Sequence, residues 1–324
     1  MNRLPKLDLN VTNRCNYRCV HCAFDSGEID MPELSLEEIR KILEDTKKLG
    51  GKRFDITGGE PLVRGDINEI IEIGKDLGYR IELITNGSLL TLEKLKGFKE
   101  RGLDSIAISI DGPDYETYSS IRKVSRKVYE KVLQSVDDVL ALGIPLKINT
   151  TVFQSNYRRI PELTDWCVEK NIAEHGLYYF TAVGRGARNK EKSVEPDKWL
   201  EFIRNNICDD RIKISLEFPF IDKKLNKETR CLAEAEQYHL QILPDGNVYP
   251  CAIMASYQMP IANLHECSVM DIWKNKALWD SYWDKASRMF KNGCCVDFSE
   301  SFDSKGYRRF VCPLRKFSKK DAGL

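Results

Sequence analysis

The sequence lacks three features, and each absence excludes a class of protein. No apolar run approaches the roughly 18 residues of a membrane span, so we expect no membrane association. No charge of one sign dominates: 50 basic and 49 acidic side chains leave a net charge of +1, which argues against nucleic-acid binding. The short basic run at 122–127 is interpreted as a solvated loop or, alternatively, a contact for a substrate phosphate. Residues 1–5 carry no signal-peptide pattern, so we expect a cytoplasmic protein.

Cysteine is abundant, but its number is odd, which argues against a disulfide framework. Cys15, Cys19 and Cys22 form a CxxxCxxC cluster directly after the alternating apolar run 7–11. Iron–sulfur cubanes are bound by cysteine thiolates, normally four of them, and this run supplies three. One iron would then lack a protein ligand, which is what a catalytic cluster requires. The alternatives are chance spacing and a zinc site completed by His21, which is awkward because the side chains of adjacent residues diverge.

The cysteine cluster and the later Gly58-Gly59-Glu60-Pro61 together resemble the radical S-adenosylmethionine (SAM) superfamily. The resemblance covers residues 5–190 as a core. It implies that the amino and carboxylate groups of SAM chelate the open iron. It also implies that one-electron reduction cleaves SAM to methionine and a 5′-deoxyadenosyl radical. The implied cofactors are a [4Fe–4S] cluster with an open iron and SAM, and the implied electron donor is a protein such as flavodoxin or ferredoxin.

Strand-like and helix-like segments alternate from residue 7 to residue 181. A capping box at Ser35 and Glu38 begins the first helical pattern, which Gly50-Gly51 ends. Further strands are predicted at 53–57, 80–85, 105–110, 146–152 and 177–181, and further helices at 67–77, 92–101, 129–142 and 160–170. Six βα repeats imply an α/β fold with a parallel sheet, either open or a partial barrel. The family resemblance implies the partial (β/α)6 barrel.

The informative polar and glycine residues follow the carboxyl ends of the predicted strands, where parallel βα proteins gather reactive groups. Gly58, Gly59 and Glu60 suit a tight turn, or a close backbone approach to a ligand with Glu60 accepting from an ammonium group. The resemblance assigns these three residues to the amino group of SAM. It assigns Ser109 and Asp111 to the ribose or the carboxylate of SAM, with a loop-closing Asx turn as the alternative for Asp111.

Two further positions are placed near the adenine of SAM by the resemblance alone. Gly184, which begins Gly184-Arg185-Gly186, corresponds to a turn in which the backbone matters more than the side chains. His21 occupies the bulky position beside the adenine, as a packing residue rather than a base.

A second group of cysteines lies toward the C-terminus. Cys231 and Cys251 flank the turn sequence Pro-Asp-Gly-Asn at 244–247, which predicts a hairpin between 240–243 and 248–249 that lets the two cysteines approach each other. Free buried cysteines are the alternative. The pattern resembles the SPASM and Twitch extensions of radical SAM enzymes, which bind auxiliary iron–sulfur clusters. No CxxC follows Cys251, so a Twitch-like form with one auxiliary [4Fe–4S] cluster fits better. The implied ligands are Cys231, Cys251, Cys312 and either Cys294 or Cys295.

The predicted organisation is a core barrel at 1–190, a connecting segment at 191–230 and an auxiliary-cluster domain at 231–324. The resemblance implies a radical SAM oxidoreductase whose auxiliary cluster accepts an electron from the substrate radical. Oxidative modification of a peptide or protein side chain is favoured. The alternatives are decarboxylation of a tetrapyrrole side chain and dehydrogenation of a small alcohol. In the second case the substrate would be a small molecule.

A non-catalytic iron–sulfur electron carrier or regulator is the alternative from another class, and the glycine-rich Gly58-Gly59-Glu60 argues against it. Because the first cysteine is residue 15, we expect no leader-peptide-binding domain before the barrel. A peptide substrate would then need a separate recognition protein or direct capture.

Overall fold

A computed structural model describes residues 4–195, 198–199, 201–202, 211–217 and 239–289. The strands in these ranges all belong to one sheet with the order β10-β9-β8-β1-β2-β3-β4-β5-β6-β7. They are β1 (Lys6–Asn10), β2 (Arg53–Thr57), β3 (Arg80–Thr85), β4 (Ser105–Ser109), β5 (Leu146–Val152), β6 (Glu174–Tyr179), β7 (Lys213–Glu217), β8 (His239–Ile242), β9 (Asn247–Tyr249) and β10 (Ala262–Asn263).

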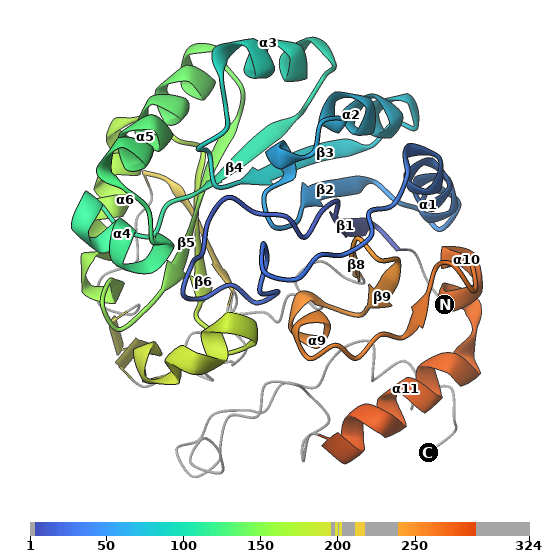
Figure 1. Ribbon diagram of the computed structural model, residues 1–324. Coiled ribbons are helices and arrows are strands. Elements are labelled where there is room, and N and C mark those ends of the chain that lie inside the picture. Colours follow the sequence, from blue (N-terminus) through green and yellow to red (C-terminus); the bar gives the residue numbers. More distant parts are fainter. Residues whose placement is uncertain (1–3, 196–197, 200, 203–210, 218–238, 290–324) are drawn as a thin grey trace.

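The sheet is parallel from β8 through β1 to β7 and antiparallel only at the β8–β9–β10 edge. Its order has two free ends, so the described strands form an open, partial barrel (Figure 1), in agreement with the predicted α/β class. The predicted hairpin is confirmed by the pairing of β8 with β9. Unexpectedly, β8 also pairs with β1, so the sheet continues across the boundaries predicted for the core and the C-terminal domain.

Helices line the outer face of the parallel sheet (Figure 1). The α-helices are α1 (Leu36–Lys48), α2 (Ile67–Asp76), α3 (Leu92–Glu100), α4 (Tyr115–Arg122), α5 (Arg126–Ala141), α6 (Ile160–Glu169), α9 (Ala252–Ser256), α10 (Val269–Lys274) and α11 (Lys276–Met289). The 3-10 helices are η1 (Pro61–Val63), η2 (Tyr157–Arg159) and η3 (Gly184–Lys192). Ser35 and Glu38 form the predicted capping box of α1. Among the described residues, no helix combines the length and apolar character needed to cross a bilayer.

The sequence patterns did not predict α4, β7 or the elements that follow the hairpin, α9, β10, α10 and α11, and they misplaced the start of β6. Helix α4 was not predicted because its Tyr, Thr and Ser residues have modest helix propensity; its N-terminus is instead stabilised by Asp114, which accepts from the backbone N–H of Thr117. Strand β7 was also not predicted. Strand β6 begins three residues before the predicted 177, because the polar His175 is buried there and interacts with Thr150 and Thr164.

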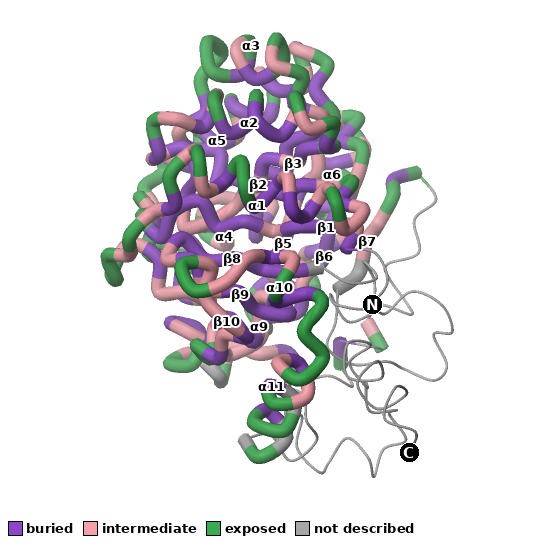
Figure 2. The backbone as a smooth tube through the Cα atoms, turned by 90° about the vertical axis from the view of Figure 1, so that its right-hand side faces the viewer, coloured by how far each residue is buried: buried purple, intermediate pink, exposed green. Residues whose placement is uncertain are grey.

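The two faces of the sheet have opposite character. Registered pairs such as Leu7 and Phe54 are fully buried under the helices, and Figure 2 shows the same concentration of buried residues along the strands. The inner face carries charge near the starts of the strands. Lys6 Nζ lies 2.9 Å from Asp55, and Glu174 lies 3.1 Å from Lys147 and 2.5 Å from Lys213. We call the residues Lys6, Asp8, Asp55, Lys147, Glu174 and Lys213 the inner charge network.

Candidate cofactor-binding site

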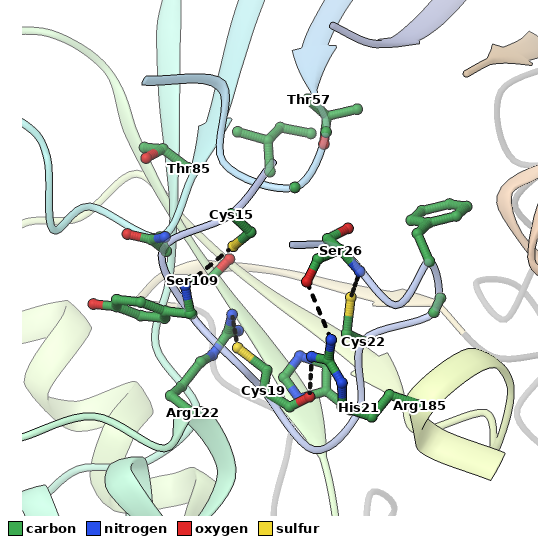
Figure 3. Close-up of a pocket in the computed structure, with 17 residues that line it drawn as sticks. Cys15, Cys19, His21, Cys22, Ser26, Thr57, Thr85, Ser109, Arg122 and Arg185 are labelled. Atoms are coloured by element: carbon green, nitrogen blue, oxygen red, sulfur yellow. Dashed lines mark hydrogen bonds between the residues drawn. The ribbon is translucent and has the colours of Figure 1, made fainter. Parts of the chain in front are cut away.

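A pocket of about 230 Å³ lies where the first strands of the sheet end (Figure 3). All three cysteines of the N-terminal cluster line it, as the sequence predicts that they share one site. The other walls come from the ends of β2, β3 and β4, from the last residue of α4 and from η3. Representative residues are Thr57, Thr85, Ser109, Arg122 and Arg185.

Each of the three sulfurs has one nearby hydrogen-bond donor (Figure 3). The backbone N–H of Tyr17 lies 3.4 Å from Cys15 Sγ, and that of Ser26 lies 3.3 Å from Cys22 Sγ. Arg122 Nη1 lies 3.9 Å from the sulfur of buried Cys19. Burial raises the pKa of the Cys15 thiol to about 12 and also raises the pKa of Cys19. The thiolates of Cys15 and Cys19 are therefore unfavourable on their own, and a bound cation would stabilise them.

The three thiols fit an iron–sulfur cluster better than a single ion. Within the described ranges, no three His, Cys, Asp or Glu side chains converge closely enough to bind one metal ion. In a cluster each thiolate binds a different iron, so convergence on one point is not required. The same observation argues against zinc bound by Cys15, Cys19, Cys22 and His21.

His21 lines the pocket as a neutral aromatic ring. Burial lowers its pKa to about 4, and Arg122 adds to this effect. The ring packs edge-on against Phe153 at a centroid distance of 5.6 Å, and its Nδ1 atom lacks a hydrogen-bond partner among the described residues. The role predicted for His21, a packing residue beside the adenine, stays a prediction.

Gly58 and Gly59 line the pocket because two chain segments meet there with no room for side chains. A Cβ atom on Gly58 would lie 2.5 Å from the carbonyl oxygen of Thr12, and one on Gly59 would lie 2.4 Å from that of Arg14. The Gly59 N–H also donates to Thr12 across 2.8 Å. The glycines therefore join the end of β2 directly to the segment that leads into Cys15.

Glu60 is not brought to the pocket surface. Its side chain is fully buried, and its carboxylate accepts from the backbone N–H groups of Leu62 and Asn86 and from the Thr85 hydroxyl, at 3.1, 2.8 and 2.7 Å. Burial raises its pKa. This carboxylate links the ends of β2 and β3, a role that the sequence analysis did not foresee.

Ser109 lines the pocket, whereas Asp111 lies behind it. Asp111 is fully buried, accepts from the Thr151 N–H across 2.7 Å and lies 2.5 Å from Arg122 Nε. It therefore positions the guanidinium group that approaches Cys19. Arg122 is a pocket residue that the sequence analysis missed; its only signal was its place in the basic run at 122–127.

Gly184 and Arg185 fix η3 against the cysteine loop. Gly184 has a φ of +55°, and a Cβ atom there would lie 2.3 Å from the carbonyl oxygen of Ala23. The Arg185 guanidinium donates to the carbonyl oxygens of Cys19 and Ser26, at 3.2 and 3.1 Å. The assignment of Gly184 to a turn beside the adenine of SAM stays a prediction, and the two side-chain hydrogen bonds of Arg185 were not expected.

Only part of the second cysteine group can be described. Cys251 is buried at the N-terminus of α9, and its sulfur accepts from the Met254 N–H across 3.5 Å. Cys267 is half-buried. The remaining predicted ligands, Cys231, Cys294, Cys295 and Cys312, lie outside the described residues, so the auxiliary ligand set stays a prediction.

Two family models match the chain. Residues 9–167 match the model of the radical SAM superfamily, and residues 231–297 match SPASM, an iron–sulfur cluster-binding domain. The AdoMet-dependent heme synthase of Methanosarcina barkeri is 25% identical over 316 residues, which cover 91% of this chain and 89% of that protein. The Fe-coproporphyrin III synthase of the same organism is 30% identical over 200 residues, which cover 61% of this chain and 50% of that protein.

Solved structures with the same fold include two proteins crystallised with SAM. Streptococcus suis SuiB bound to SAM has a TM-score of 0.68 at 17% identity, covering 86% of this chain and 67% of that chain. The anSMEcpe structure with AdoMet and the Cp18Cys peptide has a TM-score of 0.66 at 16% identity, covering 98% of this chain and 95% of that chain. At these identities the likeness establishes the fold alone.

Proposed function

The chain belongs to the radical SAM superfamily and carries a SPASM iron–sulfur domain, and we propose that it abstracts hydrogen from a peptide or protein side chain at the described pocket. Its cofactors are [4Fe–4S] clusters and SAM. One observation carries the proposal for the site: the three thiols of Cys15, Cys19 and Cys22 line one pocket together with Gly58 and Gly59.

When bound, the cluster supplies the electron that cleaves SAM to methionine and a 5′-deoxyadenosyl radical. The residues of the chain hold and shield these groups. Cys15, Cys19 and Cys22 would bind three irons, and the backbone at Gly58 and Gly59 would approach the amino group of SAM. Ser109 and Arg122 offer polar groups on another wall, and the neutral ring of His21 provides an apolar surface for the adenine, near Gly184.

The oxidative outcome is proposed from the C-terminal domain. Cys231, Cys251, Cys312 and one of Cys294 or Cys295 would bind an auxiliary cluster that accepts an electron from the substrate radical. Replacing Cys231 and Cys251 together should lower iron from about eight to about four per chain, if both clusters are cubanes. SAM cleavage should persist while substrate conversion fails. A wild-type protein that holds only about four irons after full reconstitution would exclude the second cluster.

Two substrate classes have specific support. A peptide is favoured because proteins of the same fold are seen with peptides bound, SuiB with its precursor peptide SuiA and anSMEcpe with Cp18Cys. A tetrapyrrole is the second candidate, because the AdoMet-dependent heme synthase matches this chain over nearly its whole length. Titration with Fe-coproporphyrin III separates them: a saturable shift of its Soret band favours the tetrapyrrole, and no shift favours the peptide.

The reaction class is tested by anaerobic reconstitution with iron and sulfide, followed by dithionite and SAM. We expect 5′-deoxyadenosine and methionine in equal amounts, measured by chromatography. A protein that binds iron but cleaves no SAM would favour the electron carrier instead. The proposed physiological reductant is a one-electron carrier protein such as flavodoxin or ferredoxin.

A further inference from the structure

At the end of α4 a residue of the pocket wall is followed directly by an exposed one. Arg122 lines the pocket, and the next residue, Lys123, is exposed to solvent. The Val20 N–H, directly after Cys19, donates to the Ile121 carbonyl oxygen across 3.0 Å. A continuous path of covalent bonds and one hydrogen bond therefore leads from the surface at Lys123 to a thiol that faces the cluster site.

Four tyrosines provide a second path from the same surface. The rings of half-buried Tyr115 and buried Tyr129 lie 6.1 Å apart, and those of Tyr129 and Tyr118 lie 5.1 Å apart. Tyr118 interacts electrostatically with Tyr17. Tyr17 lines the pocket, and in the sequence it stands between Cys15 and Cys19. Closely packed aromatic rings carry electron tunnelling better than gaps or water, and the packed rings of Tyr115, Tyr129 and Tyr118 lead from the surface towards Tyr17.

The surface over these two paths is mainly basic. We call it the α4–α5 face; Figure 1 shows both helices together on one side of the sheet, away from α1. Its exposed basic residues are Lys123, Arg126, Lys127 and Lys131, and its exposed acidic residues are Glu116, Glu130 and Asp137, of which Asp137 pairs with Lys170 across 2.5 Å. Arg126 pairs with Glu116 across 2.7 Å and covers the Tyr115 ring at 4.4 Å.

Lys123 and Lys127 have no ion-pair partner among the residues that the structure describes, so their charge is available to a partner. A negatively charged partner would be attracted to the α4–α5 face.

We infer that the α4–α5 face docks an acidic one-electron carrier protein, such as a flavodoxin or ferredoxin, and that electrons enter the pocket there. The inference rests on the proposed function, because it assumes a cluster at Cys15, Cys19 and Cys22. The step is a simple transfer: the reduced carrier loses one electron and the cluster gains it, with no bond made or broken. The basic run at 122–127, which the sequence analysis interpreted as a solvated loop, would then also bind the electron carrier.

The charge of the face is tested with the double variant Lys123→Glu/Lys127→Glu. Cluster reduction is followed by its visible absorbance without SAM, using either fully reduced flavodoxin or dithionite. We expect the flavodoxin-driven rate to fall by about tenfold or more, and less so at high salt, because electrostatic steering is lost. The dithionite-driven rate and the iron content should not change.

A matched control is Lys41→Glu/Lys52→Glu, which makes the same change of charge at two exposed lysines on α1 and before β2. It should leave both rates near those of the wild type. An equal loss of flavodoxin-driven rate in both double variants would mean that only net charge matters, and it would overturn the docking face. An unchanged rate in Lys123→Glu/Lys127→Glu would overturn it as well.

The aromatic path is tested at its outer end. Tyr115→Leu removes the ring, whereas Tyr115→Phe retains it and removes only the hydroxyl, which lies 3.4 Å from the Val124 carbonyl oxygen. We expect a loss of flavodoxin-driven reduction in Tyr115→Leu alone, and equal rates in the two variants would exclude the path. A wild type that dithionite reduces but that cleaves no SAM would instead refute the proposed function while leaving the docking result readable.

Discussion

At the starts of the strands the charged side chains are already paired with one another, whereas at the carboxyl ends three cysteine thiols face an open pocket. Glu174 in the inner charge network lies between Lys147 and Lys213. Although burial alone would raise its pKa, these two lysines lower it to about 2. At the other end, burial raises the pKa of Cys15 to about 12, and the one backbone N–H that opposes this shift, from Tyr17, does not cancel it.

This difference between the two ends of the strands shows where binding of a cofactor can contribute to the free energy of unfolding. A charge network that is complete within the chain gains little from a ligand, so substitutions there should alter stability alone. Buried thiols with raised pKa values gain most from a bound metal, because binding removes the cost of their ionisation. Substitutions at the pocket should therefore alter cofactor binding and activity, and four variants test this division.

The largest effect is expected for Cys19→Ala. It removes the most buried of the three thiols, so production of 5′-deoxyadenosine should be abolished. Some iron should remain after anaerobic reconstitution, held by the C-terminal cysteines. Unchanged SAM cleavage, measured by chromatography, would remove the basis for assigning the cluster to this pocket.

Asp111→Asn should be the next most damaging, because it leaves the buried Arg122 without its carboxylate. Breaking a buried pair by removing one partner destabilises by about 3–5 kcal/mol, measurable by denaturant unfolding. In Asp111→Asn/Arg122→Met both charges are gone, so we expect stability to recover. SAM cleavage should not recover in the double variant if Arg122 acts in the pocket. If SAM cleavage does recover, Asp111 and Arg122 have only a structural role.

Glu60→Ala distinguishes a linking carboxylate from a SAM ligand. The variant leaves the hydrogen-bond donors of Leu62, Thr85 and Asn86 without their acceptor, so we expect a loss of stability of about 1–3 kcal/mol and iron content near wild type. A direct contact with the ammonium group of SAM would instead weaken SAM binding roughly ten- to a hundredfold. Calorimetric titration with SAM beside an unfolding curve separates the two.

The smallest effect is expected for Glu174→Gln, in the inner charge network. Because its folded-state pKa of about 2 lies below the ordinary 4.5, Glu174 binds fewer protons when folded, and the stability it contributes is lost as pH falls through this window. The variant should lack that part of the pH dependence and lose about 1 kcal/mol or less near neutral pH. Reduced SAM cleavage in this variant would contradict the division between the two ends.

Local patterns allowed much of the fold and the cysteine site to be predicted. Apolar periodicity identified six of the parallel strands, and turn chemistry identified the β8–β9 hairpin. The pairing of β8 with β1 was not predictable, because nothing in either strand specifies its distant neighbour. Arg122 was missed for the same reason: its function depends on Asp111 and Cys19, which only the folded chain brings beside it. Glu60 was recognised, but the sequence could not show that its oxygens are used by Leu62, Thr85 and Asn86.

The pairing of β1 with β8 has a consequence for synthesis of the protein. A ribosome makes β1 first, yet the strand on one of its two edges begins only at His239. Until that segment emerges, the edge of β1 has no partner, and open edges of this kind favour aggregation. A shortened gene product ending before His239 would therefore lose more than the auxiliary cysteines. It would leave unsupported the very strand that leads into Cys15, and the catalytic half would be a poor candidate for an independent module.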